Sequence, residues 1–232
     1  MVAVIGDIHG CFNTLKILVE ETRKKYPDIS LYCVGDLVDR GNFSYEVIEY
    51  IIAESIKFTP GNHDYMFYHF VHEPFSGMGT AWLYNGYETT MSSYNDRYEK
   101  INEHLEMIKS APLYYNLDDC FICHAGISVF LKRKFAQNVL EDIEKFDKVI
   151  LEEMETDEGI LWTRNKLLDL GKLQVVGHTR KNEVEFNKEN NTAYIDTSVY
   201  THNKLTAIIV EKNRIIDTIS ARTVPDDLPT RI

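Results

Sequence analysis

The sequence predicts an α/β protein in which two β-sheets pack on each other and helices lie outside them. Over roughly the first sixty residues, short β-branched runs alternate with segments of helical spacing, as they do in βαβ units. From Leu113 onward the pattern changes to short apolar runs, which turn-forming pairs such as Asn190-Asn191 and Lys212-Asn213 separate. Two strand-rich halves that each carry helices favour a β-sandwich flanked by helices.

Each expected strand is a short run of apolar, mostly β-branched residues. The strands cover residues 2–6, 30–34, 56–59, 113–117, 120–124, 174–177, 193–196, 205–211 and 214–220. In the expected helices, apolar residues recur three or four positions apart, as Leu15, Leu18 and Val19 do. The helices cover residues 12–25, 45–54, 65–70, 82–94, 98–108 and 139–155. We expect a loop with Pro74 and two glycines after the third helix. The two helices that follow should form an insertion over the edge of the functional site.

The chain length and the composition bound the domain organisation. We expect one domain over residues 1–222, followed by an irregular tail over residues 223–232. The formal net charge of -11 predicts a surface that repels nucleic acid and anionic membranes. No run approaches the roughly 18 apolar residues of a membrane span, and the first residues lack the features of a signal peptide. We therefore expect a cytoplasmic protein that binds neither nucleic acid nor membranes.

The cysteines carry one motif that has two readings. Cys120-Phe121-Ile122-Cys123-His124 matches the pattern by which c-type haem is attached. The same segment is typical of a buried strand, in which residues three apart point to opposite faces of the sheet. Two cysteines on opposite faces cannot share one cofactor without a bulge. We expect core cysteines with His124 alone taking part in chemistry, and four cysteines are too few for a disulfide scaffold.

Five short motifs place a carboxylate, an imidazole or a carboxamide beside a glycine. The first three follow expected strands, where open α/β sheets place their ligands. Asp7 and His9 are two positions apart, so both side chains face the same way if the extended conformation persists. Because a polynuclear metal site needs oxygen and imidazole donors from several loops, the motifs together predict a two-metal site. They are Gly6-Asp7-Ile8-His9-Gly10, Gly35-Asp36-Leu37-Val38-Asp39-Arg40-Gly41, Gly61-Asn62-His63-Asp64, His124-Ala125-Gly126 and Gly177-His178-Thr179.

In this order the motifs resemble those of the calcineurin-like metallophosphoesterases, and within them the bacterial and phage serine/threonine phosphoprotein phosphatases. The resemblance runs from about Ala3 to about Leu205. It implies a four-layer αββα fold and two divalent metal ions, with manganese the first choice and iron or zinc as alternatives. The ligands that it implies, with Asp36 bridging both ions, are Asp7, His9, Asp36, Asn62, His124 and His178.

The same resemblance assigns the substrate and acid groups. Arg40 and Arg164, the latter within Leu161-Trp162-Thr163-Arg164, are expected to hold the substrate phosphate together with Asn62, because guanidinium forks match phosphate oxygens. In the family, the histidine corresponding to His63 protonates the leaving oxygen, and the aspartate corresponding to Asp39 orients it. The implied reaction is in-line attack by a metal-bridging hydroxide on a phosphoester.

Four positions depart from the usual pattern of the family. Asp64 stands where many members have glutamate, although members that cleave dinucleoside polyphosphates often have aspartate. Tyr87 and Ser198 each replace a glycine, and Arg180 stands where proline is frequent. We expect all four to lie on the rim of the site, where they bear on the identity of the substrate.

The main functional reading is a phosphatase for phosphoserine and phosphothreonine, with phosphotyrosine left open, in proteins, peptides or small phosphoesters. Symmetrical hydrolysis of diadenosine tetraphosphate is the first alternative, and Asp64 favours it. A metal-binding scaffold without catalysis is the second. The intact acid pair and phosphate clamp count against a scaffold, and the acidic surface counts against processing of nucleic-acid ends.

Overall fold

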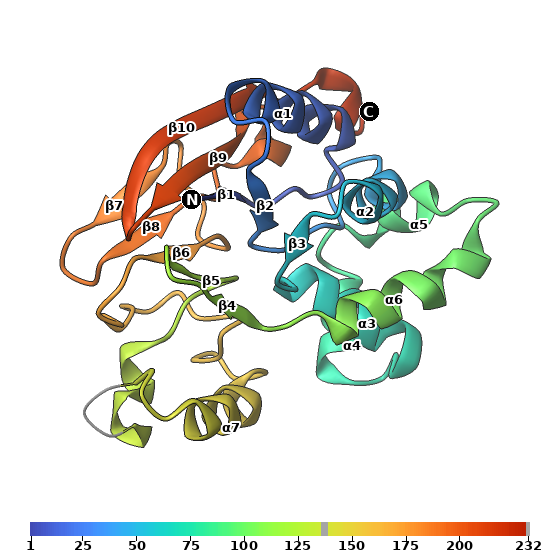
Figure 1. Ribbon diagram of the computed structural model, residues 1–232. Coiled ribbons are helices and arrows are strands. Elements are labelled where there is room, and N and C mark those ends of the chain that lie inside the picture. The colour runs from blue at the N-terminus through green and yellow to red at the C-terminus, as the bar shows by residue number, and fades with distance from the viewer. Residues whose placement is uncertain (136–138, 231–232) are drawn as a thin grey trace.

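Two five-stranded sheets form the centre of the computed structural model, which describes residues 1–135 and 139–230 (Figure 1). The first sheet contains β1 (Val2–Ile5), β2 (Ser30–Cys33), β3 (Lys57–Phe58), β9 (Lys204–Glu211) and β10 (Arg214–Arg222) in the order β10-β9-β1-β2-β3. The second contains β4 (Tyr114–Asn116), β5 (Phe121–Cys123), β6 (Gln174–Val176), β7 (Glu185–Asn187) and β8 (Thr192–Tyr194) in the order β4-β5-β6-β8-β7. Within each sheet three adjacent strands run parallel, β1-β2-β3 in the first and β5-β6-β8 in the second.

The helices lie on the outer faces of the two sheets (Figure 1). Side chains of α1 (Phe12–Lys25), α2 (Ser44–Ala53), α3 (Asn62–His72), α4 (Gly77–Trp82) and α6 (Ile101–Ser110) join the buried core on the outside of the first sheet. Phe146 and Ile150 of α7 (Ile143–Glu153) join a second core on the outside of the other sheet. The remaining helical segments are α5 (Tyr87–Ser93) and the 3-10 helices η1 (Tyr98–Lys100), η2 (Val129–Lys134), η3 (Val199–Thr201) and η4 (Pro225–Asp227).

A third apolar cluster lies between the two sheets. Strand alternation explains it: Val2 and Val4 of β1 face this inner cluster, whereas Ala3 and Ile5 face the outer one. Full burial of a valine or isoleucine side chain contributes roughly 1.5 to 3 kcal/mol, so strands buried on both faces hold the layers together. The predicted four-layer αββα arrangement is confirmed.

Cys120 and Cys123 occupy two different layers, as the sequence predicts. Cys120 belongs to the inner cluster between the sheets, and Cys123 to the outer cluster beneath α7. Both are buried free thiols, and burial raises the pKa of each, to about 12 for Cys120. The two sulfur atoms therefore serve packing in separate layers.

Several expected elements differ from those of the structure. The single helix expected over residues 82–94 is two helices, because Gly86 at φ 95° breaks it between α4 and α5. The loop expected after residue 70 is partly helical, since α3 extends to His72 and α4 begins at Gly77. The edge strand β7 was not expected, because Glu185-Phe186-Asn187 is short and shows no apolar alternation. α7 begins at Ile143, four residues later than the expected start.

Residues 223–230 are fixed to the start of α1. The buried Asp227 in η4 accepts hydrogen bonds from the backbone N–H groups of Asn13 and Thr14 at 2.9 and 2.8 Å. Cys11, at the N-cap position of α1, does not cap these N–H groups with its side chain, so Asp227 satisfies them from the far end of the chain. Because α1 directly follows the first glycine motif, this contact also supports the loop that carries Asp7 and His9.

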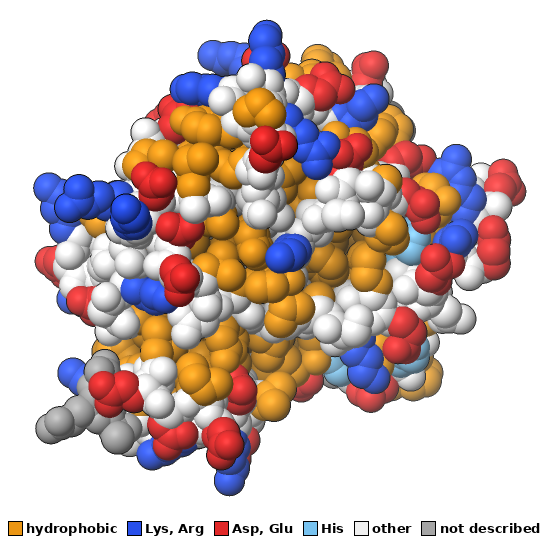
Figure 2. Space-filling model, in the orientation of Figure 1, with side chains coloured by type: hydrophobic (Ala, Val, Ile, Leu, Met, Phe, Trp, Pro, Cys, Tyr) orange, Lys and Arg blue, Asp and Glu red, His pale blue; other side chains and the backbone are white. Residues whose placement is uncertain are grey.

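An apolar groove of about 490 Å³ runs between β4 and α7, apart from the predicted site, and Leu113, Ile150, Leu151 and Met154 are among its lining residues. Apolar side chains gather across the middle of this face in Figure 2. Among the described residues, the structure contains no helix that combines the length and apolar character needed to cross a membrane.

Candidate metal centre

The predicted site residues meet where the parallel strands of both sheets end. Motifs after β1, β2 and β3 in the first sheet and after β5 and β6 in the second supply them. They surround a cavity of about 190 Å³. The sequence-predicted residues that line it are Asp7, His9, Asp36, Arg40, Asn62, His63, Arg164 and His178, while Asp39 and His124 are buried against this group, Asp39 hydrogen-bonded to His63 and His124 beside Asn62.

The backbone of the site is held in an unusual conformation. His9, Asp36, Asp39, Arg40 and His178 all have positive φ, between 46° and 72°, which is the left-handed region that non-glycine residues rarely adopt. The chain is therefore not extended through Asp7 and His9, and the expectation that strand alternation aligns these two side chains is wrong in its reason. A turn aligns them instead, fixed by the N–H groups of Ile8 and His9, which donate to the carbonyl of Asp36 at 3.1 and 2.7 Å.

One set of donor atoms converges on Asn62. His124 Nδ1 lies 2.9 Å from the carbonyl oxygen of Val34, so this nitrogen carries the proton and Nε2 presents a lone pair. His178 Nε2 lies 3.0 Å from the carbonyl oxygen of Trp162, so its Nδ1 presents a lone pair in the same way. With Asn62 oriented as in the structure, these lone pairs face its Oδ1 at 3.0 and 2.8 Å.

A cation between these three acceptor atoms would satisfy all of their lone pairs. An octahedral ion with bonds of about 2.1 Å separates neighbouring ligand atoms by about 3.0 Å, and the observed separations from Asn62 Oδ1 are 3.0 and 2.8 Å. Asp36 Oδ1 lies 3.5 Å from His124 Nε2 and supplies a charged fourth donor. These side chains therefore fit a divalent metal ion.

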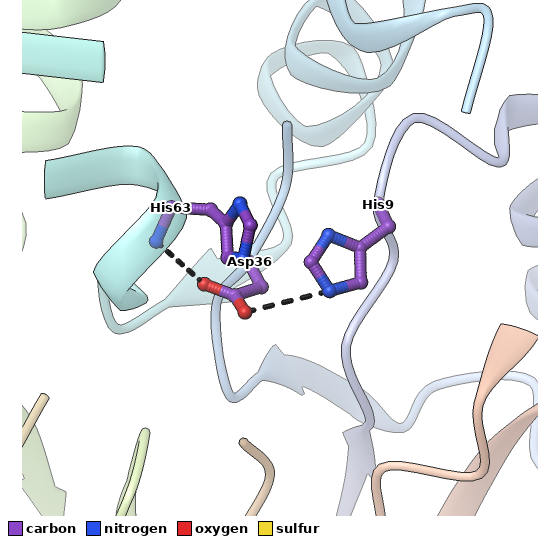
Figure 3. A group of neighbouring side chains, drawn as sticks. All are labelled: His9, Asp36 and His63. Atoms are coloured by element: carbon purple, nitrogen blue, oxygen red, sulfur yellow. Dashed lines mark hydrogen bonds and ion pairs between the residues drawn. The ribbon is translucent and has the colours of Figure 1, made fainter. Parts of the chain in front are cut away.

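A second set of donors lies on the other side of Asp36. His9 Nδ1 donates to the carbonyl oxygen of Val38 at 3.0 Å, which leaves its Nε2 lone pair 3.5 Å from Asp36 Oδ2 (Figure 3). The two oxygens of Asp36 thus face two different histidines, as a bridging carboxylate requires. The backbone N–H of His63, in the first turn of α3, donates to Asp36 Oδ1 at 3.0 Å and fixes the carboxylate.

Two glycines leave room for the carboxylates of Asp7 and Asp36. A β-carbon on Gly177 would lie 1.9 Å from Asp7 Oδ1, and one on Gly61 would lie 2.1 Å from Asp36 Oδ1. Gly61 and Gly177 are thus required by close approach of the backbone to the carboxylates of Asp36 and Asp7.

The charges of the site also fit cations. Burial raises the pKa of Asp7, and the neighbouring carboxylates of Asp196 and Asp36 raise it further. Burial acts on Asp36 in the same direction, but surrounding imidazoles, first that of His124, hold its pKa well below the usual range. Burial lowers the pKa of His9 and His178, which favours the neutral rings. The lone pair of His9 Nε2 accepts a hydrogen bond from Arg40 at 2.9 Å, and that of His178 Nδ1 faces Asn62. Divalent cations would offset the crowded carboxylates and accept these lone pairs.

His63 and Asp39, the two residues predicted to act as an acid pair, lie in contact. His63 Nδ1 lies 2.7 Å from Asp39 Oδ2 in a buried pair. Trp82 Nε1 and Thr90 Oγ1 donate to the same carboxylate at 2.9 and 2.7 Å, so the inserted helices support it. Arg40 donates to His63 Nε2 at 2.8 Å, and because a guanidinium only donates, the proton of the neutral imidazole lies on Nδ1.

The structure adds residues that the sequence argument did not assign to the site. Asp196 follows β8 as the predicted ligands follow their own strands, and this position was the signal available for it. Its side chain is buried beside Asp7 and lines the cavity. The ring of Tyr200 lies 4.8 Å from that of His9 and 4.2 Å from the guanidinium carbon of Arg40. Arg180 lines the mouth of the cavity.

The expectation that Asp64 lies on the rim is wrong. Asp64 is fully buried, and its oxygens accept hydrogen bonds from the N–H groups of Leu37 and Gly61, both at 2.8 Å. It links the second motif to the third, so it does not meet the substrate. Ser198 is mostly buried, at 7% exposed, whereas Tyr87 is half-buried and Arg180 is exposed.

Comparisons with known proteins agree with this geometry. The model of a family described as calcineurin-like phosphoesterase matches residues 1–210. The asymmetrical bis(5'-nucleosyl)-tetraphosphatase PrpE of Anoxybacillus flavithermus is 31% identical over 97% of this chain and 94% of its own. A symmetrical bis(5'-nucleosyl)-tetraphosphatase of Vibrio campbellii is 29% identical over 68% of this chain and 59% of its own.

Two solved structures share the fold. A cold-active protein-tyrosine phosphatase of a Shewanella species matches with a TM-score of 0.65 at 18% identity, over 95% of this chain and 80% of its own. A protein serine/threonine phosphatase of Saccharomyces cerevisiae matches with a TM-score of 0.60 at 15% identity, over 96% and 80%. Since the family model covers most of the chain and the fold agrees with it, this chain belongs to the calcineurin-like phosphoesterase family and is a metallophosphoesterase hydrolase.

Proposed function

We propose that this chain hydrolyses dinucleoside polyphosphates at a centre that holds two divalent metal ions, manganese first among them. The observation that carries the proposal is the convergence of unprotonated donor atoms on both sides of Asp36, next to the arginines that line the same cavity. The names of the relatives from Anoxybacillus flavithermus and Vibrio campbellii support the choice of substrate. We assign one ion to Asp7, His9 and Asp36, and the other to Asp36, Asn62, His124 and His178.

The side chains divide the remaining work among them. When bound, the ions supply charge stabilisation and an activated water. Arg40 and Arg164 hold the oxygens of the reacting phosphate, and Asn62 helps to orient it. His63 takes up a proton at Nε2 and donates it to the leaving oxygen, while Asp39 stabilises the charged imidazolium.

One observation favours a second candidate, the phosphatase for phosphoserine and phosphothreonine. An alkoxide is a poor leaving group and needs a proton as it departs, whereas a nucleotide leaves readily. The buried His63–Asp39 pair is the acid that an alkoxide needs. A test of the proposed function must therefore include both substrate classes.

The test compares three substrates with added Mn²⁺: diadenosine tetraphosphate, a phosphoserine peptide and p-nitrophenyl phosphate. We expect the highest kcat/KM on diadenosine tetraphosphate, with Asp36→Asn as the inactive control. Chromatography of the products separates asymmetrical cleavage, which yields AMP and ATP, from symmetrical cleavage, which yields ADP alone. A higher kcat/KM on the phosphopeptide would replace the proposed substrate with the second candidate, and parallel assays with Fe²⁺ and Zn²⁺ test the choice of metal.

A further inference from the structure

The site carries more arginine charge than one phosphate needs. Arg40, Arg164 and Arg180 all line the cavity. Within residues 1–135 and 139–230, none of the three has a carboxylate within ion-pair distance, whereas Arg23 and Arg97 pair with Glu54 and Glu46. Two guanidinium forks match the free oxygens of a single phosphate. The third arginine is therefore not needed for that phosphate.

Arg180 is placed by a defined set of contacts. The N–H of Lys181 donates to the carbonyl of Asp196 at 2.9 Å, and Ser198 Oγ donates to the carbonyl of Lys181 at 3.1 Å. The guanidinium of Arg180 lies 5.9 Å from the centre of the Tyr200 ring, which Arg40 also contacts. One aromatic ring therefore spaces the inner arginine from the outer one.

An open groove of about 1130 Å³ continues outward from the cavity. Arg164, His178 and Arg180 line both spaces, so a substrate longer than one phosphate leaves the cavity past Arg180. The acidic side chains of the groove are already paired, Glu183 with Lys204 and Glu185 with Lys181. The charge that faces a ligand here is therefore positive.

We propose that Arg180 binds the phosphate next to the reacting one, so that the site takes a chain of at least two phosphates. The inference rests on the proposed function in that Arg40 and Arg164 hold the reacting phosphate. Arg180 is then a specificity residue, which separates phosphate chains from phosphomonoesters. Charge-assisted hydrogen bonds of this kind contribute roughly 1.5 to 3 kcal/mol, or about 10- to 100-fold in affinity.

The experiment measures the dissociation constants of AMP and ADP by calorimetry on the Mn²⁺-loaded protein, because the two ligands differ by one phosphate. In the wild type we expect ADP to bind at least tenfold more tightly than AMP. Arg180→Gln should reduce this ratio at least fivefold, and Arg180→Lys should reduce it less. Arg214→Gln is the matched control, since Arg214 is exposed at the start of β10, near the opposite end of the sheet.

A smaller reduction in Arg180→Gln, or an equal reduction in Arg214→Gln, would overturn the proposal. So would a wild type that binds AMP and ADP equally. The measurement needs no turnover, so it separates the two proposals. If the ratio depends on Arg180 but diadenosine tetraphosphate is not hydrolysed, the phosphate subsite stands and the proposed substrate fails.

Discussion

Asp196 is a buried carboxylate whose removal should stabilise the metal-free protein. The side chain is 2% exposed, and its burial, together with the charge of Asp36, raises its pKa from 3.8 to about 6. A carboxyl with a raised pKa contributes stability below its unfolded pKa and loses it as the pH rises through its folded pKa. At pH 8 the cost of ionising Asp196 in the folded state is roughly 3 kcal/mol, from about 1.36 kcal/mol per pKa unit.

Asp196→Asn removes that cost. In the wild type the N–H of Ser198 donates a hydrogen bond to Asp196 Oδ1 at 2.9 Å, and the amide oxygen of asparagine can still accept it. Urea unfolding of metal-free protein should show the variant more stable than wild type by roughly 3 kcal/mol at pH 8 and by about half of that at pH 5. Asp157→Asn, at an exposed carboxylate, should show no such pH-dependent difference.

The effect of Asp196→Asn on stability should reverse when metal is bound. The charge of Asp196 helps to offset the cations that we place beside Asp7, so Asp196→Asn should bind Mn²⁺ more weakly than wild type. Calorimetric titration checks this. A variant that is no more stable than wild type at pH 8, or that gains the same amount at pH 5 and pH 8, would refute the reasoning.

Three further changes test other parts of the site. His63→Asn should lose roughly 10²-fold or more on a phosphoserine peptide and distinctly less on p-nitrophenyl phosphate, whose leaving group departs unprotonated; equal losses in kcat/KM would contradict the acid role. Gly177→Ala should lose Mn²⁺ affinity, because its β-carbon would lie 1.9 Å from Asp7 Oδ1; unchanged affinity in a calorimetric titration would contradict the close approach. Cys120→Ser with Cys123→Ser should keep metal content and activity and lower only the melting temperature; loss of a metal ion, or a haem absorption band in the wild type, would show that the cysteines bind a cofactor.

Much of the fold could be predicted because it depends on local patterns. The runs that form β1, β2 and β9 are apolar and β-branched, and the helix over residues 12–25 has matching bounds in sequence and structure. The helix break at Gly86 could not be predicted from local patterns. Its segment has helical spacing, but the backbone there is left-handed and the Gly86 carbonyl accepts a hydrogen bond from the N–H of Arg40, a contact that no local pattern contains.

The site divides in the same way. His124 and His178 could be proposed because each stands beside a glycine at the end of an apolar run. The roles of Asp64 and Asp227 could not, since both act through hydrogen bonds to backbone N–H groups of distant segments. Arg180 was singled out as a departure from a pattern, but its contact with Tyr200, and the lack of a carboxylate partner for it among the described residues, needed the three-dimensional arrangement.

The most direct test of the account is a titration of the metal-free protein with Mn²⁺, comparing wild type with Asp36→Asn. The two oxygens of Asp36 face His9 and His124, so one carboxylate should serve both ions. We predict two bound ions per chain in the wild type, and loss of both high-affinity sites together with phosphoesterase activity in the variant, whose circular dichroism should remain that of a folded protein. A wild type that binds no Mn²⁺ at this centre, or an Asp36→Asn variant that keeps two ions and normal turnover, would contradict the account.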